Sequence, residues 1–319
     1  MKSGRNITVS APAKIHLLGE HSSVYGKPAI LTSVDLRLKV TISQGRTIPE
    51  ELKKLQKLID RIVKTELKLK KIPLYSLEIS SDIPIGAGLG SSAAVSAAYV
   101  GALLTYLRVT WSLERIYRLG FKAEEVFHGN PSGGDLATVV FGGLIWFRRE
   151  TPTLKLIQPL SFNISSKLTK RFVLINTGTP KESTRDLVAM VKELYTKKPK
   201  KVENFSNYQE KLVKELLTVI KEGNEKEFIR IIREGERNLE SIGVVSKSSK
   251  EIIMKIEEAG GAAKICGAGG KAEATGVLLC YHKQKKVVEN IAKAYSKNRY
   301  NLPYFSAKLG VEGVKLEKI

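Results

Sequence analysis

The chain has 319 residues, 42% of them hydrophobic, which is enough for one large domain or two ordinary domains with buried cores. It has no apolar stretch of 18 residues and no apolar N-terminal region, which argues against a membrane span and against secretion. Its two cysteines lack CxxC spacing, and it has only four histidines, which argues against a disulfide framework and against structural zinc. These features predict a cytoplasmic protein. The formal net charge of +21 suggests a nucleic-acid partner, but many basic residues lie on one face of a predicted helix without an aromatic-studded basic strand, so we expect no nucleic-acid partner.

Hydrophobic periodicity predicts strands and helices in the first half of the chain. Alternating apolar and polar side chains predict half-buried strands, whereas apolar side chains at helical spacing opposite lysines and arginines predict an amphipathic helix. The expected elements are a strand beginning with ITVSA at residue 7, a strand at 34–42, an amphipathic helix at 50–71, a strand at 74–80, a buried helix at 92–107, and a strand pair or bulged strand at 139–147 around Gly142 and Gly143.

Helical patterns dominate the second half of the chain. The expected elements are a polar stretch at 161–170, a strand at 171–176, helices at 183–196, 208–222, 225–241 and 247–259, a glycine cluster at 267–270 and a strand at 276–281. The lysine-rich residues 197–201 predict an exposed loop between two helices. We therefore expect an α+β protein of two domains, residues 1–160 and residues 161–319.

A glycine-rich loop before the buried helix is the strongest functional signal. It joins three alternating glycines to two serines at the start of that helix, in the order Pro84, Ile85, Gly86, Ala87, Gly88, Leu89, Gly90, Ser91, Ser92, Ala93 and Ala94. Glycines allow positive φ and close approach to an anion, and a helix N-terminus offers unpaired N–H groups and the positive end of its dipole. The loop predicts a triphosphate site, with a glycine turn capped by serine as the structural alternative.

Two familiar phosphate loops do not match this sequence. The Walker pattern requires Ser or Thr after Gly-Lys, but Gly270-Lys271 is followed by Ala272, and Ile265 stands where a glycine is needed. A dinucleotide fold would place its glycines directly after a first strand, with an acidic residue about 20 positions later. A kinase-like loop remains the best interpretation.

Further motifs accompany the loop in order along the chain. They are APAKIHLLGEH at 11–21, overlapping GEHSSVYGKPAI at 19–30, then EEVFHGNPSGGD at 124–135, NTGTPKESTRDLVAMV at 176–191 and KICGAGG at 264–270. With these motifs, nearly the whole sequence resembles the GHMP kinases, and within that family the archaeal mevalonate kinases. The resemblance implies an N-terminal domain like domain 2 of ribosomal protein S5, a ferredoxin-like C-terminal domain and an active site between them. It also implies Mg²⁺- and ATP-dependent phosphorylation of the C5 hydroxyl of mevalonate, in the mevalonate pathway of isoprenoid biosynthesis.

The resemblance gives four residues chemical roles. Lys14 and Asp135 match the catalytic lysine and aspartate, while Ser92 and Glu124 match the Mg²⁺ ligands. The residue types suit this chemistry, because Mg²⁺ prefers hard oxygen ligands and phosphoryl transfer mainly needs positioning and charge neutralisation. Asp135 would accept the proton of the substrate hydroxyl, and Lys14 would keep that carboxylate ionised.

Several assignments have alternatives. Glu125 is the rival to Glu124, although Glu124 alone lies one helical turn before His128 on the same face. Ser91 and Ser92 compete for the roles of helix cap and metal ligand.

One histidine is expected to face the substrate, together with a glutamate, and two others are expected to be structural. Glu20 and His21 match substrate-facing positions of mevalonate kinases, although a histidine of this kind is often only a packed residue. His16 and His282 are interpreted as structural residues.

One departure from the family pattern bears on the substrate. Lys271-Ala272-Glu273-Ala274 follows the late glycines, where mevalonate kinases usually have more glycine and a cysteine. Phosphomevalonate kinase and mevalonate 3-kinase are therefore the rival activities. The sequence does not set the oligomeric state, and a homodimer stays open.

Overall fold

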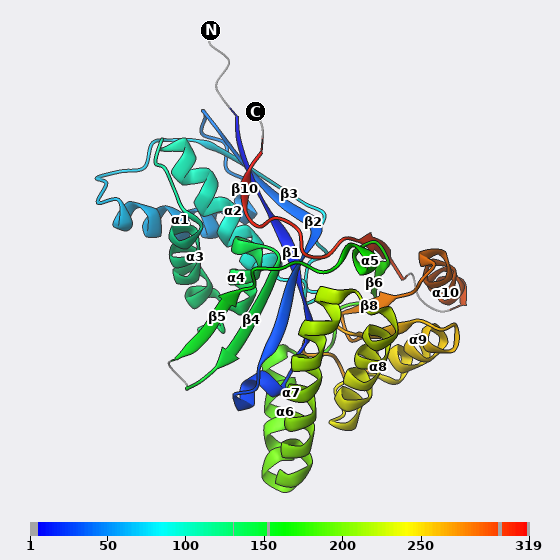
Figure 1. Cartoon of the computed structure of the whole chain (residues 1–319). Coiled ribbons are helices and arrows are strands. Elements are labelled where there is room, and N and C mark those ends of the chain that lie inside the picture. The colour runs from blue at the N-terminus through cyan, green and yellow to red at the C-terminus, as the bar shows by residue number, and fades with distance from the viewer. Residues whose placement is uncertain (1–5, 130, 152–153, 299–301, 318–319) are drawn as a thin grey trace.

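Two antiparallel β-sheets organise the chain (Figure 1). The structure is a computed structural model that describes residues 6–129, 131–151, 154–298 and 302–317. In the described residues the first sheet has the order β10-β1-β2-β4-β5, with β3 also paired to β2, and the second has the order β7-β8-β6-β9. Residues 1–5 and Asn130 of the HGNPSGGD motif lie outside the described residues.

The first sheet is built on a long hairpin that positions the site. Its strands are β1 (Ile7–Leu18), β2 (Ala29–Ser43), β3 (Ser76–Ser81), β4 (Leu144–Arg149), β5 (Lys155–Pro159) and β10 (Lys315–Leu316). Its helices are α1 (Lys53–Glu66), α2 (Ser91–Tyr106), α3 (Leu113–His128) and α4 (Gly134–Phe141), with the short 3-10 helices η1 (Ser22–Tyr25) and η2 (Glu50–Leu52). Helix α2 packs on β1 and β2 and is covered by α1 and α3, which explains why it is apolar on every side.

The second sheet carries the remaining helices. Its strands are β6 (Phe172–Asn176), β7 (Ala262–Ile265), β8 (Val277–Tyr281) and β9 (Tyr304–Ala307). The helices are α5 (Ser166–Thr169), α6 (Thr184–Lys197), α7 (Pro199–Glu222), α8 (Glu225–Ser241), α9 (Lys247–Glu258) and α10 (Lys285–Asn298). Helices α8 and α9 pack on β7, and α10 packs on β6 and β8.

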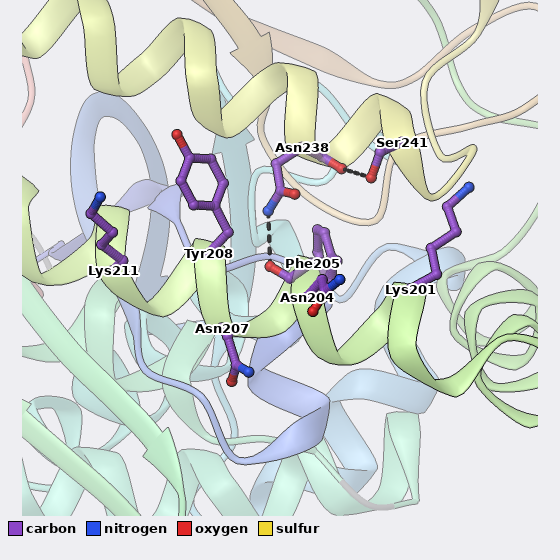
Figure 2. Close-up of a pocket in the computed structure, with 8 residues that line it drawn as sticks. All are labelled: Lys201, Asn204, Phe205, Asn207, Tyr208, Lys211, Asn238 and Ser241. Carbon is purple, nitrogen blue, oxygen red and sulfur yellow. Dashed lines mark hydrogen bonds between the residues drawn. The ribbon is translucent and has the colours of Figure 1, made fainter.

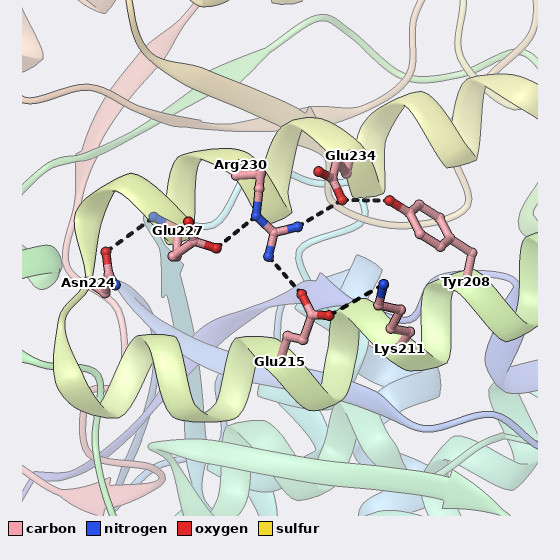
Figure 3. A network of polar contacts seen from close by, with 7 residues as sticks. All are labelled: Tyr208, Lys211, Glu215, Asn224, Glu227, Arg230 and Glu234. Atoms are coloured by element: carbon pink, nitrogen blue, oxygen red, sulfur yellow. Dashed lines mark hydrogen bonds and ion pairs between the residues drawn. The ribbon is translucent and has the colours of Figure 1, made fainter.

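A polar network joins α7 to α8 (Figure 3). The guanidinium of Arg230 donates to Glu215, Glu227 and Glu234 at 2.7, 2.8 and 3.0 Å. The hydroxyl of Tyr208 also donates to Glu234, at 2.6 Å. The Arg230 network therefore links the exposed faces of two long helices through the Arg230–Glu215 pair.

Two local predictions are wrong. Residues 139–141 belong to helix α4, and β4 begins only at Leu144, after Gly142 and Gly143 turn the chain at φ +72° and +64°. An apolar run that is buried on all sides has no alternation to separate helix from strand. The expected loop at 197–201 is almost entirely helical, because α6 ends at Lys197 and α7 begins at Pro199, a residue suited to the first helical position.

The end of the chain returns to the first sheet. Strand β10 pairs with β1, and isolated bridges join Val34 to Leu309 and Gly142 to Glu312. The backbone hydrogen bonds of this last segment lie with the N-terminal sheet. The division at residue 160 stays a prediction.

Candidate active site

The glycine-rich loop adopts the backbone that its sequence predicts. Gly86, Gly88 and Gly90 have φ values of +73°, +80° and +76°, a region that suits glycine. Gly90 is the N-cap of α2, and no side chain of the described residues caps this helix. Ser91 is its first residue, so the expectation that one of Ser91 and Ser92 caps the helix is wrong. The loop thus presents an uncapped helix N-terminus, which favours an anion.

Lys14 lies beneath this loop and contacts Asp135. The backbone N–H of Lys14 donates to the carbonyl of Leu89 at 3.0 Å, and a Cβ placed on Gly90 would lie only 2.7 Å from Lys14 Cγ. Lys14 Nζ is 3.0 Å from Asp135 Oδ2; the lysine side chain is 5% exposed and that of Asp135 is 41% exposed. Burial alone would raise the pKa of Asp135, but the charge and hydrogen bond of Lys14 outweigh it and lower that pKa. Asp135 is thus an ionised carboxylate open to a ligand.

Ser92 and Glu124 form a second group at the start of α2. Ser92 Oγ donates to Glu124 Oε2 at 3.3 Å, and Ser96 Oγ donates to Glu124 Oε1 at 3.0 Å. His128 Nε2 lies 3.1 Å from Ser92 Oγ and 3.6 Å from Glu124 Oε2. Burial raises the pKa of Glu124, against the opposing effects of Ser96 and His128. The expected contact between Glu124 and His128 along one face of α3 is present, whereas Glu125 is exposed.

The donor set fits Mg²⁺ bound together with a nucleotide. One hydroxyl and one carboxylate supply hard oxygens, and Mg²⁺ typically fills its other positions with phosphate oxygens and waters. Within the described part of the chain, no group of three or more His, Cys, Asp or Glu side chains is arranged to hold a metal ion. A cation at Ser92 and Glu124 would therefore depend on further ligands from the nucleotide.

Glu20 forms a fully buried ion pair across the two sheets. Lys264, the third residue of β7, contacts Glu20, which lies two residues after the end of β1, and their side chains are 0% and 2% exposed. Lys264 Nζ also donates to the main-chain oxygen of His16 at 3.3 Å, while Glu20 Oε2 has no hydrogen-bond partner among the described residues. Glu236 of α8 accepts the N–H of Ile265 at 3.1 Å. The carboxylate of Glu20 therefore faces Lys264, and one of its oxygens is unpaired.

His21 ties the first motif to the late glycine cluster. Its Nε2 lies 2.9 Å from the carbonyl oxygen of Ala268, and burial lowers its pKa, so the ring is neutral near pH 7. The residue has φ +58°, and Gly269 packs so tightly that a Cβ would lie 2.1 Å from the carbonyl oxygen of Val244. His21 and Ala268 thus hold the two loops together.

The segment that departs from the family pattern folds back onto the late glycines, because a Cβ on Gly270 would lie 1.9 Å from the carbonyl oxygen of Ala274. Glu273 accepts hydrogen bonds at its main-chain oxygen from Ser246 and Ser248, and its carboxylate lies 3.4 Å from Lys181 Nζ. Lys271 and Glu273 are exposed, and the N–H of Lys271 points to Glu182 at 3.4 Å. The bulkier residues are accommodated on the surface beside α9.

Sequence reasoning missed three members of this region. Ser96 was not named, and Lys264 was named only as the first residue of the KICGAGG motif, without a role. A serine one turn after Ser92 and a lysine before a glycine cluster are detectable signals. His16 was interpreted as structural, yet it lies two residues beyond Lys14 on β1.

A surface hollow between α7 and α8 contains none of the predicted site residues (Figure 2). Phe205, Tyr208 and Lys211 of α7 line it opposite Asn238 of α8, whose side-chain amide donates to the carbonyl of Phe205 at 2.9 Å. The hollow lacks the cation-carboxylate arrangement found at Lys14.

Comparisons with known proteins agree with this architecture. A family model described as the GHMP kinases N terminal domain matches residues 53–143. The mevalonate kinase of Thermococcus sibiricus is 30% identical over 98% of this chain and 99% of its own, and that of Pyrococcus horikoshii is 32% identical over 83% and 86%. The crystal structure of L. major mevalonate kinase in complex with R-mevalonate superposes with a TM-score of 0.80, at 18% identity and 98% coverage of both chains.

Taken with the two sheets and the loop at α2, these similarities define a GHMP kinase. The chain belongs to the mevalonate kinase family, within the GHMP kinases. The fold expected from the resemblance is confirmed. Among the described residues, no helix has both the length and the apolar character needed to cross a membrane.

Proposed function

We propose that this protein transfers the γ-phosphoryl group of ATP to the C5 hydroxyl of (R)-mevalonate. The observation that carries the proposal is the Lys14–Asp135 pair, which places a partly exposed carboxylate beside a buried lysine, directly under an uncapped helix N-terminus. The full-length relatives named mevalonate kinase support this substrate over phosphomevalonate and over a nucleic acid. A cytoplasmic location and a homodimer stay predictions.

The chain's own residues provide positioning and charge. The loop from Pro84 to Ala94 binds the phosphates through backbone N–H groups. The hydroxyl of Ser92 and the carboxylate of Glu124 hold Mg²⁺, which neutralises phosphate charge when bound. Ser96 orients Glu124 through the hydrogen bond to its second oxygen.

The reaction replaces one bond to phosphorus with another. The C5 oxygen forms a bond to the γ-phosphorus as the bond to the β–γ bridging oxygen breaks, and ADP leaves. Asp135 accepts the proton of the C5 hydroxyl, and Lys14 stabilises the negative charge that develops on the oxygen. Glu20 and His21 lie at the junction of the two loops and shape the substrate end of the site.

A coupled assay of ADP release tests this proposal. The panel contains mevalonate, phosphomevalonate, galactose and homoserine, each with ATP and Mg²⁺. We expect kcat/KM for mevalonate to exceed that for each other compound by about a hundredfold or more, because phosphomevalonate lacks the free C5 hydroxyl that must approach within about 3–3.5 Å. A preference for phosphomevalonate would overturn the proposal.

A further inference from the structure

His16 occupies an unexplained position at the centre of the site. Between Lys14 and His16 the pairing of β1 with β2 is regular, so the two side chains project from the same face of the strand. The neighbouring Ile15, on the opposite face, is fully buried in the core. His16 therefore faces the same side as the reacting group beneath the glycine loop.

The surroundings of His16 are charged, yet its imidazole is not. Lys14, Asp135 and Lys264 all act on it electrostatically, and Lys264 also bonds its main-chain oxygen. Burial, followed by the nearby charge of Lys14, lowers the pKa of His16 to about 3, so the ring is neutral at physiological pH. A neutral imidazole offers one hydrogen-bond donor and one acceptor.

One ring nitrogen of His16 lacks a hydrogen-bond partner among the described residues. His16 Nδ1 is buried and has no hydrogen-bond partner in the described part of the chain. A buried polar atom without a partner is costly, so the ring gains by turning toward a ligand. His16 as a whole is only partly buried, which leaves part of the imidazole open to such a ligand. The charged side chains nearby are already paired, Lys14 with Asp135 and Lys264 with Glu20.

We infer that His16 binds the substrate, with its imidazole hydrogen-bonded to the uncharged C3 hydroxyl of mevalonate. This inference rests on the proposed function. Residues two apart in a strand are separated by about 6.6 Å, so a group bound beside His16 lies near one held at Lys14 and Asp135. In mevalonate a single carbon separates the carbon that carries the C3 hydroxyl from the reacting C5 carbon, and a neutral ring suits a hydroxyl better than a carboxylate.

The test compares two substrates in two enzymes. 5-Hydroxy-3-methylpentanoate is mevalonate without the C3 hydroxyl and retains the C5 hydroxyl and carboxylate. We expect the wild-type enzyme to prefer mevalonate by about tenfold or more in kcat/KM, since the analogue leaves the imidazole unpaired. In His16→Leu this preference should shrink to within about threefold, with KM for ATP unchanged.

Two further variants separate binding from structure. His16→Asn keeps a polar atom near the position of Nδ1 and should retain part of the preference, even if the leucine variant folds poorly. Ile15→Val perturbs the same strand from its core face and should retain all of it. A purely structural role would lower kcat/KM for both substrates equally and leave their ratio intact.

The outcomes distinguish this inference from the proposed function. If wild-type enzyme phosphorylates mevalonate but His16→Leu keeps the full preference for the C3 hydroxyl, the role of His16 is refuted and the proposed function stands. The role of His16 is equally refuted if wild-type enzyme uses both substrates alike. If wild-type enzyme does not phosphorylate mevalonate, the proposed function fails, and this inference with it.

Discussion

The protein contains two groups of ion pairs that share their chemistry but differ in burial. The Arg230 network between α7 and α8 lies on the surface, with the Arg230 side chain 39% exposed (Figure 3). The Lys264–Glu20 pair lies between the two sheets, with side chains 0% and 2% exposed. Exposed pairs contribute about 0–1 kcal/mol each, whereas breaking a buried pair on one side costs about 3–5 kcal/mol.

This difference indicates that the buried ion pairs hold elements of the site in place and add little to the net free energy of folding. Taking two charges out of water consumes much of their attraction, and apolar replacements of both partners are often as stable. Lys264 nevertheless links β7 to the main chain at His16, and Lys14 links the glycine loop to Asp135. Substitutions of the buried charged residues should therefore strongly reduce activity or stability. Substitutions in the Arg230 network should change both only slightly.

The largest effect is expected at Asp135. Asp135→Asn preserves shape but cannot accept a proton, so kcat should fall by roughly 10² to 10⁴ with little change in KM for ATP. Steady-state kinetics with ATP and mevalonate checks this. Retained kcat with a raised KM for ATP would instead make Asp135 a nucleotide-binding residue.

The proposed metal ligands should come next. Ser92→Ala and Glu124→Gln should each lower kcat on the order of a hundredfold, because transition-state charge loses stabilisation. Circular dichroism should show unchanged folding, and the exposed neighbour Glu125→Gln serves as the matched control. A near-normal rate in either Ser92→Ala or Glu124→Gln would exclude that residue as a ligand.

The buried pair predicts a large loss of stability. Lys264→Met leaves Glu20 buried without a partner, so unfolding in urea should become easier by about 3–5 kcal/mol. The double variant Lys264→Met with Glu20→Gln removes both charges and should recover much of the loss. An equal loss in the single and the double variant would contradict the pairing.

The buried carboxyl group of Glu236 predicts that the stability of a Glu236→Gln variant relative to wild type depends on pH. Burial raises the pKa of Glu236 from 4.5 to about 8, against the opposing charge of Lys264. The folded state thus holds this proton more tightly, so the contribution of Glu236 to stability declines as pH rises from about 4.5 to about 8. Glu236→Gln cannot ionise and still accepts the N–H of Ile265, so it should gain about 1–3 kcal/mol relative to wild type over that range.

Urea unfolding at several pH values measures this difference. The exposed Glu222→Gln is the control and should follow wild type throughout. A constant difference between Glu236→Gln and wild type from pH 5 to pH 8 would show that Glu236 ionises normally.

The smallest effect is expected in the Arg230 network. Arg230→Ala should lower stability by about 1 kcal/mol or less, and added salt should reduce the effect further. Its kcat should equal that of wild type. A loss as large as that of Lys264→Met would remove the distinction between the two groups.

Local patterns were enough to predict most elements and the main motifs. The strand at 34–42 and the helix at 225–241 follow from periodicities of two and 3.6 residues, and both are confirmed. Helix α4 was not predicted, because its buried apolar residues show neither period. The start of α7 was missed because Pro199 resembles a helix breaker as much as a first helical residue.

Long-range contacts could not be predicted in the same way. Lys264 and Glu20 are 244 residues apart, and no local pattern pairs them. The position of His16 beside Lys14, Asp135 and Lys264 also depends on how the two sheets meet. The motifs therefore identified residue types suited to phosphoryl transfer, whereas the pairing of their charges required the fold.

Phosphorus NMR of the reaction product tests the central claim most directly. ATP, Mg²⁺ and mevalonate are incubated with wild-type enzyme and, as a control, with Asp135→Asn. The account predicts a new phosphomonoester signal split by the two C5 methylene protons, formed by wild type and nearly absent with the variant. An unsplit signal from a phosphate on the tertiary C3 oxygen, or no phosphate ester at all, would contradict it.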